Sequence, residues 1–351
     1  NPTQRVCDSN KGLSMVLSEI AKVLRSSRFF QHKHDISDVL GALNKVMPVN
    51  AGNGVLIGDD CAAIPEGDGY LLFAIEGLVS EFVREMPWFA GYSGVMVNIS
   101  DIYAMGGRPI AVVNALWSEG LINAEKIVEG MAQASKVYGV PIVGGHSNVR
   151  SNQGQLAVSI LGRANKLLSS FNARPGDKLL MAIDMRGKFE NDYPYWNASS
   201  KASPERLRKD LEILPLLAEE ELCDAAKDIS MAGIIGTSIM LLECSGVGAN
   251  IDLNKLPIPP EVPILRWLAA FPSYGFVLSV RPEHGQAVIS KFKNRFIACQ
   301  EIGVVNDTKK VTLEYQGATE VIWDLNTHHF ILPTTSTAAV VDSSLQRSRN
   351  A

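Results

Sequence analysis

The chain has 351 residues, 46% hydrophobic and 20% charged, which is typical of a globular protein and long enough to predict two domains. A net charge of −4 argues against nucleic-acid binding, which usually needs a basic surface. No apolar run is long enough to span a membrane. The five scattered cysteines, without a CxxC pair, argue against a disulfide framework or zinc site and favour a cytoplasmic protein. Because the chain begins with Asn1 and not Met, we expect a processed or trimmed N-terminus.

The first half predicts short elements whose ends carry polar residues. Residues 1–48 form a helical lead, and residues 49–165 form the first domain. Hydrophobic periodicity predicts helices at 14–30, 34–46, 88–105 and 124–138, and strands at 55–57, 70–75, 110–117, 140–143 and 155–162. Four element ends carry polar groups, near Asp59, Glu76, Asp101 and His146, which is where functional sites are usually assembled.

A second domain is expected at 173–325, after a linker at 164–172. Strands are predicted at 178–183, 249–253, 274–280, 297–305, 310–315 and 320–323, and helices at 204–222, 231–245, 262–270 and 283–295. Residues 188–203 are aromatic and polar without a period, so we expect an ordered loop near a site or interface. The tail at 333–351 is rich in Ser and Thr and is expected to be disordered. This mixed order predicts two α+β domains, not a doubly wound sheet.

The helix at 88–105 carries an unusual polar pair. Asn98 and Asp101 are three residues apart and therefore share one helix face. Their neighbours, including Ile99 and Ile102, are apolar. The pair is either a local cap or satisfied buried polar pair, or part of a functional site.

Carboxylates upstream favour the functional alternative. Asp59 and Asp60 are adjacent, which is costly unless cations or hydrogen-bond donors share their charge. With Asp101 and Glu76 they make an oxygen-rich ligand set that suits magnesium and not zinc. Carboxylate-bound magnesium usually shares its ligands with substrate phosphates, so phosphoryl transfer from a nucleotide is the expected chemistry. Alternatively, Asp59 and Asp60 form only a turn. The chain has no Walker-type or kinase-type glycine loop.

Two further polar residues each allow two interpretations. His146, within the turn predicted at 144–147, is a general acid/base or a ligand, or it caps the turn. Asp228 is the N-cap of the helix beginning at Met231. Alternatively, with Gly233 and Gly236 beside it, it marks a helix N-terminus that a ligand phosphate approaches closely.

In this order the motifs resemble the superfamily of aminoimidazole ribonucleotide (AIR) synthase, thiamine-monophosphate kinase, selenophosphate synthetase and the hydrogenase-maturation dehydratase. The matching stretches are 58–62, 98–109, 143–147, 174–177 and 228–233, within about residues 50–305. The resemblance implies an enzyme that uses ATP and Mg²⁺ on a small-molecule substrate. It also implies a homodimer in which the N-terminal sheet pairs with its twin, flanked by a C-terminal α+β domain.

The resemblance also implies roles for individual residues. By motif position, Asp59, Asp60 and Asp101 would hold magnesium, Asn98 would lie near the nucleotide, and Gly144 and Gly145 would approach its phosphates. To these we add Glu76 as a metal ligand, Ser147 and Asp228 as nucleotide-binding residues, and Asp101 and His146 as catalytic candidates. Glu76 stands where the family usually has Asp, which puts the metal geometry in question. His146 stands where thiamine-phosphate kinases carry an acidic residue.

Other departures place the chain in an AIR-synthase-related branch apart from the four named activities. Cys7 lacks the glycine-rich context of selenophosphate synthetases, the chain has no C-terminal Cys, and the aromatic stretch near 193–196 fits none of them. The leading expectation is an ATP- and magnesium-dependent ligase or phosphotransferase. The alternatives are a catalytically degenerate nucleotide-sensing or scaffolding member, and a metal-binding protein without nucleotide chemistry. The sequence does not choose among amides, ribotides and acids as acceptor.

Overall fold

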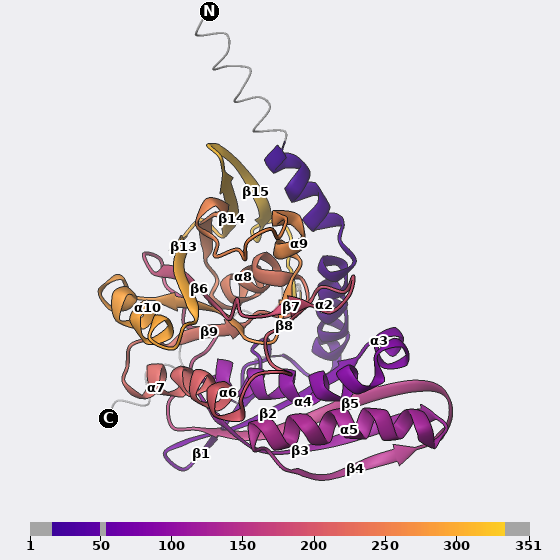
Figure 1. The fold of residues 1–351 in the computed structure, drawn as a ribbon. Helices are drawn as coiled ribbons and strands as arrows, with labels where there is room; N and C mark the ends of the chain where they lie inside the picture. The colour runs from indigo at the N-terminus through magenta and orange to yellow at the C-terminus, as the bar shows by residue number, and fades with distance from the viewer. Residues whose placement is uncertain (1–15, 50–53, 334–351) are drawn as a thin grey trace, which may run out of the picture.

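The computed structural model describes residues 16–49 and 54–333, in two halves stacked on one another (Figure 1). The predictions for residues before 16 and for the tail after 333 lie outside this range. A helix over 16–26 precedes the elements of the first half. These are α2 (Arg28–Val46), β1 (Ala62–Glu66), β2 (Gly69–Leu78), α3 (Ser80–Glu85), α4 (Pro87–Ala104), β3 (Arg108–Glu119), α5 (Leu121–Tyr138), β4 (Ile142–Asn148) and β5 (Arg150–Ala164).

The first half is a five-stranded sheet with helices on one face. Its order is β1-β2-β5-β3-β4, and α4 and α5 lie side by side across it (Figure 1). The two helices cross closely because glycines face one another. A Cβ on Gly91 would lie 2.0 Å from the Ile127 carbonyl oxygen, and one on Gly130 would lie 1.9 Å from that of Trp88. Helix α4 is therefore buried along almost its whole length.

The opposite face of this sheet is apolar, and no helix or strand among the described residues covers it. On β2, Leu72 points inward and is fully buried, whereas Phe73 and Ile75 are 53% and 67% exposed. The register places Phe73 beside Leu161 of β5, and Val113 of β3 lies further along the same face. The alternation follows from the two-residue period of a strand.

The second half consists of helices, a seven-stranded sheet and a small three-stranded sheet. Its helices are α6 (Pro204–Leu211), α7 (Ile213–Glu219), α8 (Gly233–Ser245), α9 (Ile264–Leu268) and α10 (Gly285–Lys293), with short 3₁₀ turns at Leu253–Lys255 and Pro282–His284. The seven-stranded sheet comprises β6 (Lys178–Ile183), β9 (Ala225–Asp228), β10 (Gly248–Asp252), β12 (Gly275–Val280), β13 (Ala298–Asn306), β14 (Lys310–Tyr315) and β15 (Ala318–Asp324). A small sheet comprises β7 (Lys188–Phe189), β8 (Tyr195–Asn197) and β11 (Phe271–Pro272).

Both faces of the seven-stranded sheet are buried. Alternation along β6 places Leu179, Met181 and Ile183 in a core with α8, while Leu180 and Ala182 join a core shared with the first half. The two halves are therefore packed on a common hydrophobic core. The helix over 16–26 belongs to the α8 side, where Leu17, Ile20 and Leu24 are buried.

The α+β class predicted from the sequence is confirmed, and several predicted elements need correction. Residues 55–57 are not a strand, and the first strand begins at Ala62. The helix expected at 204–222 is broken at Glu212, because Pro215 cannot donate a backbone hydrogen bond and fits only the first turn of a new helix. The turn expected at 144–147 is part of β4, because the parallel neighbour β3 supplies its hydrogen bonds. None of the described helices combines the length and apolar character needed to cross a membrane.

Candidate active site

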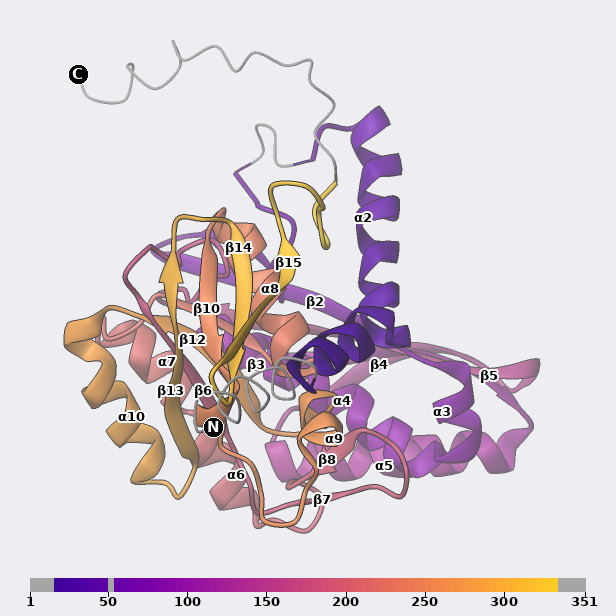
Figure 2. The same ribbon diagram turned by 90° about the horizontal axis from the view of Figure 1, so that it is seen from above.

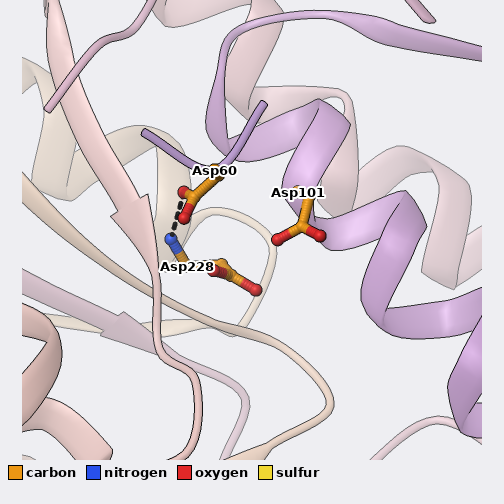
Figure 3. Close-up of side chains that lie close together, drawn as sticks. All are labelled: Asp60, Asp101 and Asp228. Atoms are coloured by element: carbon orange, nitrogen blue, oxygen red, sulfur yellow. Dashed lines mark hydrogen bonds between the residues drawn. The ribbon is translucent and has the colours of Figure 1, made fainter. Parts of the chain in front are cut away.

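Three carboxylates from distant segments meet where the two halves join (Figure 3). Asp60 lies in the loop before β1, Asp101 in the last turn of α4, and Asp228 at the end of β9. One oxygen of each lies within 4.8 Å of those of the other two. The sequence predicted the first two as metal ligands and Asp228 as a nucleotide-binding residue, and the structure places all three together.

The environment of these carboxylates suits a divalent cation. Asp101 is 5% exposed, and its Oδ2 has no hydrogen-bond partner among the described residues. Burial raises the pKa of Asp101 well above its ordinary value, and the negative charges of Asp228, Glu76 and Asp60 raise it further. Burial likewise raises the pKa of Asp228, followed by the charge of Asp60. An oxygen-only donor set with an unpartnered buried oxygen fits magnesium.

Asp60 is held in place by two donors from β9. Its Oδ1 lies 2.6 Å from Nζ of Lys227. Its Oδ2 accepts a 3.1 Å hydrogen bond from the backbone N–H of Asp228 (Figure 3). Burial works to lower the pKa of Lys227, but Asp60 and Asp59 outweigh it, so the pKa is raised and the ammonium stays charged. Sequence reasoning missed Lys227. The signal was a lysine inside a strand of otherwise small residues.

Asp59, predicted as a metal ligand, is not one of the three converging groups. Its carboxylate accepts hydrogen bonds from the hydroxyls of Ser169 and Ser170, each at 2.7 Å, and from the Ser170 backbone N–H. The preceding Gly58 has a φ of +134°, and a Cβ there would lie 3.0 Å from Cys244 Sγ. Asp59 therefore ties the loop that carries Asp60 to the segment between the two halves.

Glu76 and Lys33 line the same cavity as the three carboxylates. Glu76 is on the inward face of β2, where burial raises its pKa and the charge of Lys33 opposes that rise. Lys33 comes from α2 and was not singled out by the sequence. Its Nζ lies 3.2 Å from Ser230 Oγ, and burial lowers its pKa.

Asn98 does not line the cavity. It is fully buried, and its Nδ2 donates to the carbonyls of Gly94 and Val158 at 2.7 and 2.9 Å. The amide thus joins α4 to β5, although its Oδ1 has no partner among the described residues. Of the two interpretations offered for the pair, Asn98 fits a buried polar residue that joins elements, whereas Asp101 fits a functional residue.

Asp228 is not a helix N-cap, because α8 begins at Gly233 with Ala232 as its cap. The room expected beside the two glycines is filled by protein. A Cβ on Gly233 would lie 1.9 Å from the Leu268 carbonyl oxygen, and one on Gly236 would lie 2.4 Å from the Ala232 Cβ. These glycines serve packing around α8.

Gly144, Gly145, His146 and Ser147 lie on β4, at the edge of the first sheet and away from the cavity. All four are exposed, and the nearest aromatic contact of the His146 ring is Trp117, 5.9 Å away. Within one chain, the structure does not bring them to the three carboxylates.

The cavity that holds the carboxylates has a volume of about 340 Å³ and is otherwise largely apolar. Its apolar lining includes Ile36 and Leu40 of α2 and the aromatic side chains of Phe82, Tyr195 and Phe271. Tyr195 belongs to the aromatic stretch that the sequence predicted to lie near a site or interface, and the structure places it in the lining of this cavity.

Comparison with known proteins identifies the two halves. Residues 58–164 match the model of the AIR synthase related protein, N-terminal domain, and residues 175–316 match that of the C-terminal domain. A protein of Synechocystis sp. described only as uncharacterised is 44% identical over 311 residues, which cover 88% of this chain and 96% of that protein.

Solved structures show the same fold at low sequence identity. Thermotoga maritima PurL complexed with ATP superimposes with a TM-score of 0.69 at 18% identity, over 92% of this chain and 55% of that one. This chain thus spans about half the length of that PurL. A structure named AaThiL, complexed with AMPPCP and TMP, gives a TM-score of 0.63 at 21% identity, over 81% of this chain and 96% of that one.

Proposed function

The chain belongs to the AIR synthase related family, and on that premise we propose that it is an ATP- and magnesium-dependent enzyme that activates a small polar substrate by phosphoryl transfer. The convergence of Asp60, Asp101 and Asp228 in one cavity carries the proposal. The ATP in the PurL complex and the AMPPCP in AaThiL support it, since both proteins share this fold. ADP and an activated substrate are the products of such a transfer.

In this proposal the acidic residues of the cavity divide into metal ligands and supporting residues. Asp60, Asp101 and Asp228 hold magnesium, which when bound would offset the negative charge of the nucleotide phosphates. Lys227 pairs with Asp60 and holds its carboxylate in place at the cavity. Glu76 lines the cavity with the three proposed metal ligands, and Asp59 fixes the loop that carries Asp60. The surrounding apolar walls limit water, which strengthens the electrostatic interactions inside.

We also propose that the enzyme is a homodimer, because its first sheet has an uncovered apolar face. Phe73, Ile75, Leu161 and Val113 lie together there, and exposed apolar patches of this kind commonly mark protein interfaces. His146 projects from β4 next to Ala115 of β3 on this face. Any contribution of His146, Gly144, Gly145 or Ser147 to a nucleotide site would therefore need the second copy.

Calorimetry of ATP binding to the full chain, with and without magnesium, tests the proposal. We expect saturable binding that strengthens with magnesium, followed by ADP release once an acceptor is present. Binding without turnover across a screen of amides, ribotides and acids would instead support the scaffolding alternative. Absence of binding at large excesses of nucleotide and magnesium would contradict both.

A further inference from the structure

Helix α2 supplies a wall of the cavity that the shared family domains do not contain. Lys33, Ile36 and Leu40 follow one another at helical spacing and all line the cavity. They precede residue 58, where the family match begins. Figure 2 shows α2 standing at one side of the molecule.

A segment beyond the second family domain also lines the cavity. Ile331 lines the cavity and lies after residue 316, where the match ends. It is held there by Glu243 of α8, whose carboxylate accepts hydrogen bonds of 2.7 Å from the backbone N–H groups of both Phe330 and Ile331. Ser37 of α2 donates to the Leu332 carbonyl at 2.8 Å, so the two added segments are bonded to each other.

Lys33 has hydrogen-bonding capacity left for a ligand. An ammonium group carries three donors, and among the described residues Lys33 makes one hydrogen bond, to Ser230. The described ion pairs within 4.0 Å do not include Lys33, although Glu76 and Asp228 act on it at longer range. The side chain is partly open to the cavity. A partly buried ammonium with unused donors is suited to an oxyanion.

Three aromatic rings that contact one another also line the cavity. The ring centroids of Phe82 and Tyr195 are 4.6 Å apart, and those of Tyr195 and Phe271 are 6.2 Å apart. These rings, together with Ile36 and Leu40 in the same lining, suit a flat apolar body.

We propose that this recess is the acceptor subsite, and that it selects a small, flat, apolar molecule bearing a carboxylate or phosphate that Lys33 binds. The inference rests on the proposed function, because it divides one cavity between nucleotide and acceptor. The metal-holding carboxylates lie within the shared family domains, whereas Lys33, Ile36, Leu40 and Ile331 lie outside them. Substrate choice is set by the residues of a site and not by the shared fold, so we assign these four residues to the acceptor.

The test is calorimetry on the full chain with four probes: benzoate, phenyl phosphate, neutral benzamide, and ATP with magnesium. We expect wild-type protein to bind at least one of the two anions and to bind benzamide about tenfold more weakly or less. Comparison of benzoate with phenyl phosphate shows whether the recess takes a carboxylate or a phosphate. Lys33→Met should weaken anion binding about tenfold or more, and Lys33→Arg should restore part of it.

Lys45→Met is the matched control, since Lys45 is exposed in the last turn of the same helix, and it should bind the anions like wild type. The inference is overturned if benzamide binds as well as the anions, if wild type binds neither anion, or if Lys33→Met binds them unchanged. It is also overturned if Lys33→Met loses ATP binding but keeps anion binding, because Lys33 then binds the nucleotide. Wild type that binds an anion but no ATP would overturn the proposed function and leave the anion site standing.

Discussion

Nζ of Lys227 lies 2.6 Å from Oδ1 of Asp60, and both side chains are at least nine-tenths buried. Lys227 comes from β9 in the second half and Asp60 from the loop before β1 in the first, so the ion pair joins the two halves at the site. One ammonium in direct contact does not balance three converging carboxylates. The remaining negative charge is costly in a buried position and favours a bound cation.

Replacing Asp101 should therefore affect stability and binding in opposite directions. Asp101→Asn removes a buried carboxylate whose Oδ2 has no partner among the described residues. Without metal, the free energy of unfolding at neutral pH should rise by about 1–2 kcal/mol, the scale of a one-unit change in pKa. Magnesium-dependent ATP binding should be lost. Urea denaturation and calorimetry measure the two effects. Asp68→Asn, at an exposed carboxylate, is the control, and a loss of both stability and binding would contradict the assignment.

The raised pKa values of Asp101 and Asp228 predict that the metal-free protein loses stability as pH rises. A carboxyl whose pKa is higher in the folded than in the unfolded protein contributes stability that is full below about pH 4 and is lost as pH rises through the folded value. Without magnesium, wild type should become less stable relative to Asp101→Asn as pH rises from about 5 to about 8. Magnesium should remove much of this difference. Unfolding free energies of both proteins across that range provide the measurement, and a difference that does not change with pH would refute the prediction.

Asp59 should matter for stability more than for metal binding. Asp59→Ala leaves the Ser169 and Ser170 hydroxyls and the Ser170 backbone N–H without their acceptor. The free energy of unfolding should fall by about 1–3 kcal/mol. In a double-mutant cycle with Ser170→Ala, the two losses should add to more than the loss in the double variant. Unchanged stability together with abolished ATP binding would show that Asp59 is a metal ligand after all.

The apolar face of the first sheet predicts the oligomeric state. Wild type should sediment as a dimer, and Phe73→Glu should sediment as a folded monomer, because the substitution places a charge in the proposed interface. Ile122→Glu is the matched control. Ile122 is 73% exposed at the start of α5, outside the sheet, and its replacement should leave the dimer intact. A wild-type monomer at micromolar concentration would rule out the proposed dimer.

Much of the fold could be predicted because hydrophobic periodicity is a local property. The strand at 178–183 matches β6, and the helix expected at 88–105 matches α4 to within one residue at each end. The short strand Ala225–Asp228 was missed, since four residues carry too little periodicity. The loss of the strand expected at 55–57 reflects a tertiary arrangement in which the first sheet begins after the acidic loop.

Only part of the site could be predicted, because the sequence pattern reports local structure. Asp60 and Asp101 stand out at element ends, but their meeting with Lys227 and Lys33 depends on contacts between segments far apart in sequence. The predicted roles of the residues around His146 came from motif order, and motif order does not place β4 at the edge of the sheet.

The central claim is that Asp60, Asp101 and Asp228 hold a divalent cation that is also bound to ATP. Electron paramagnetic resonance with Mn²⁺ in place of magnesium tests it most directly, through the coupling between bound Mn²⁺ and the ³¹P nuclei of ATP. The account predicts bound Mn²⁺ coupled to phosphorus in wild type, and Mn²⁺ that stays free of the protein in Asp228→Asn. Protein that binds ATP without holding Mn²⁺, or an Asp228→Asn variant with the wild-type spectrum, would contradict it.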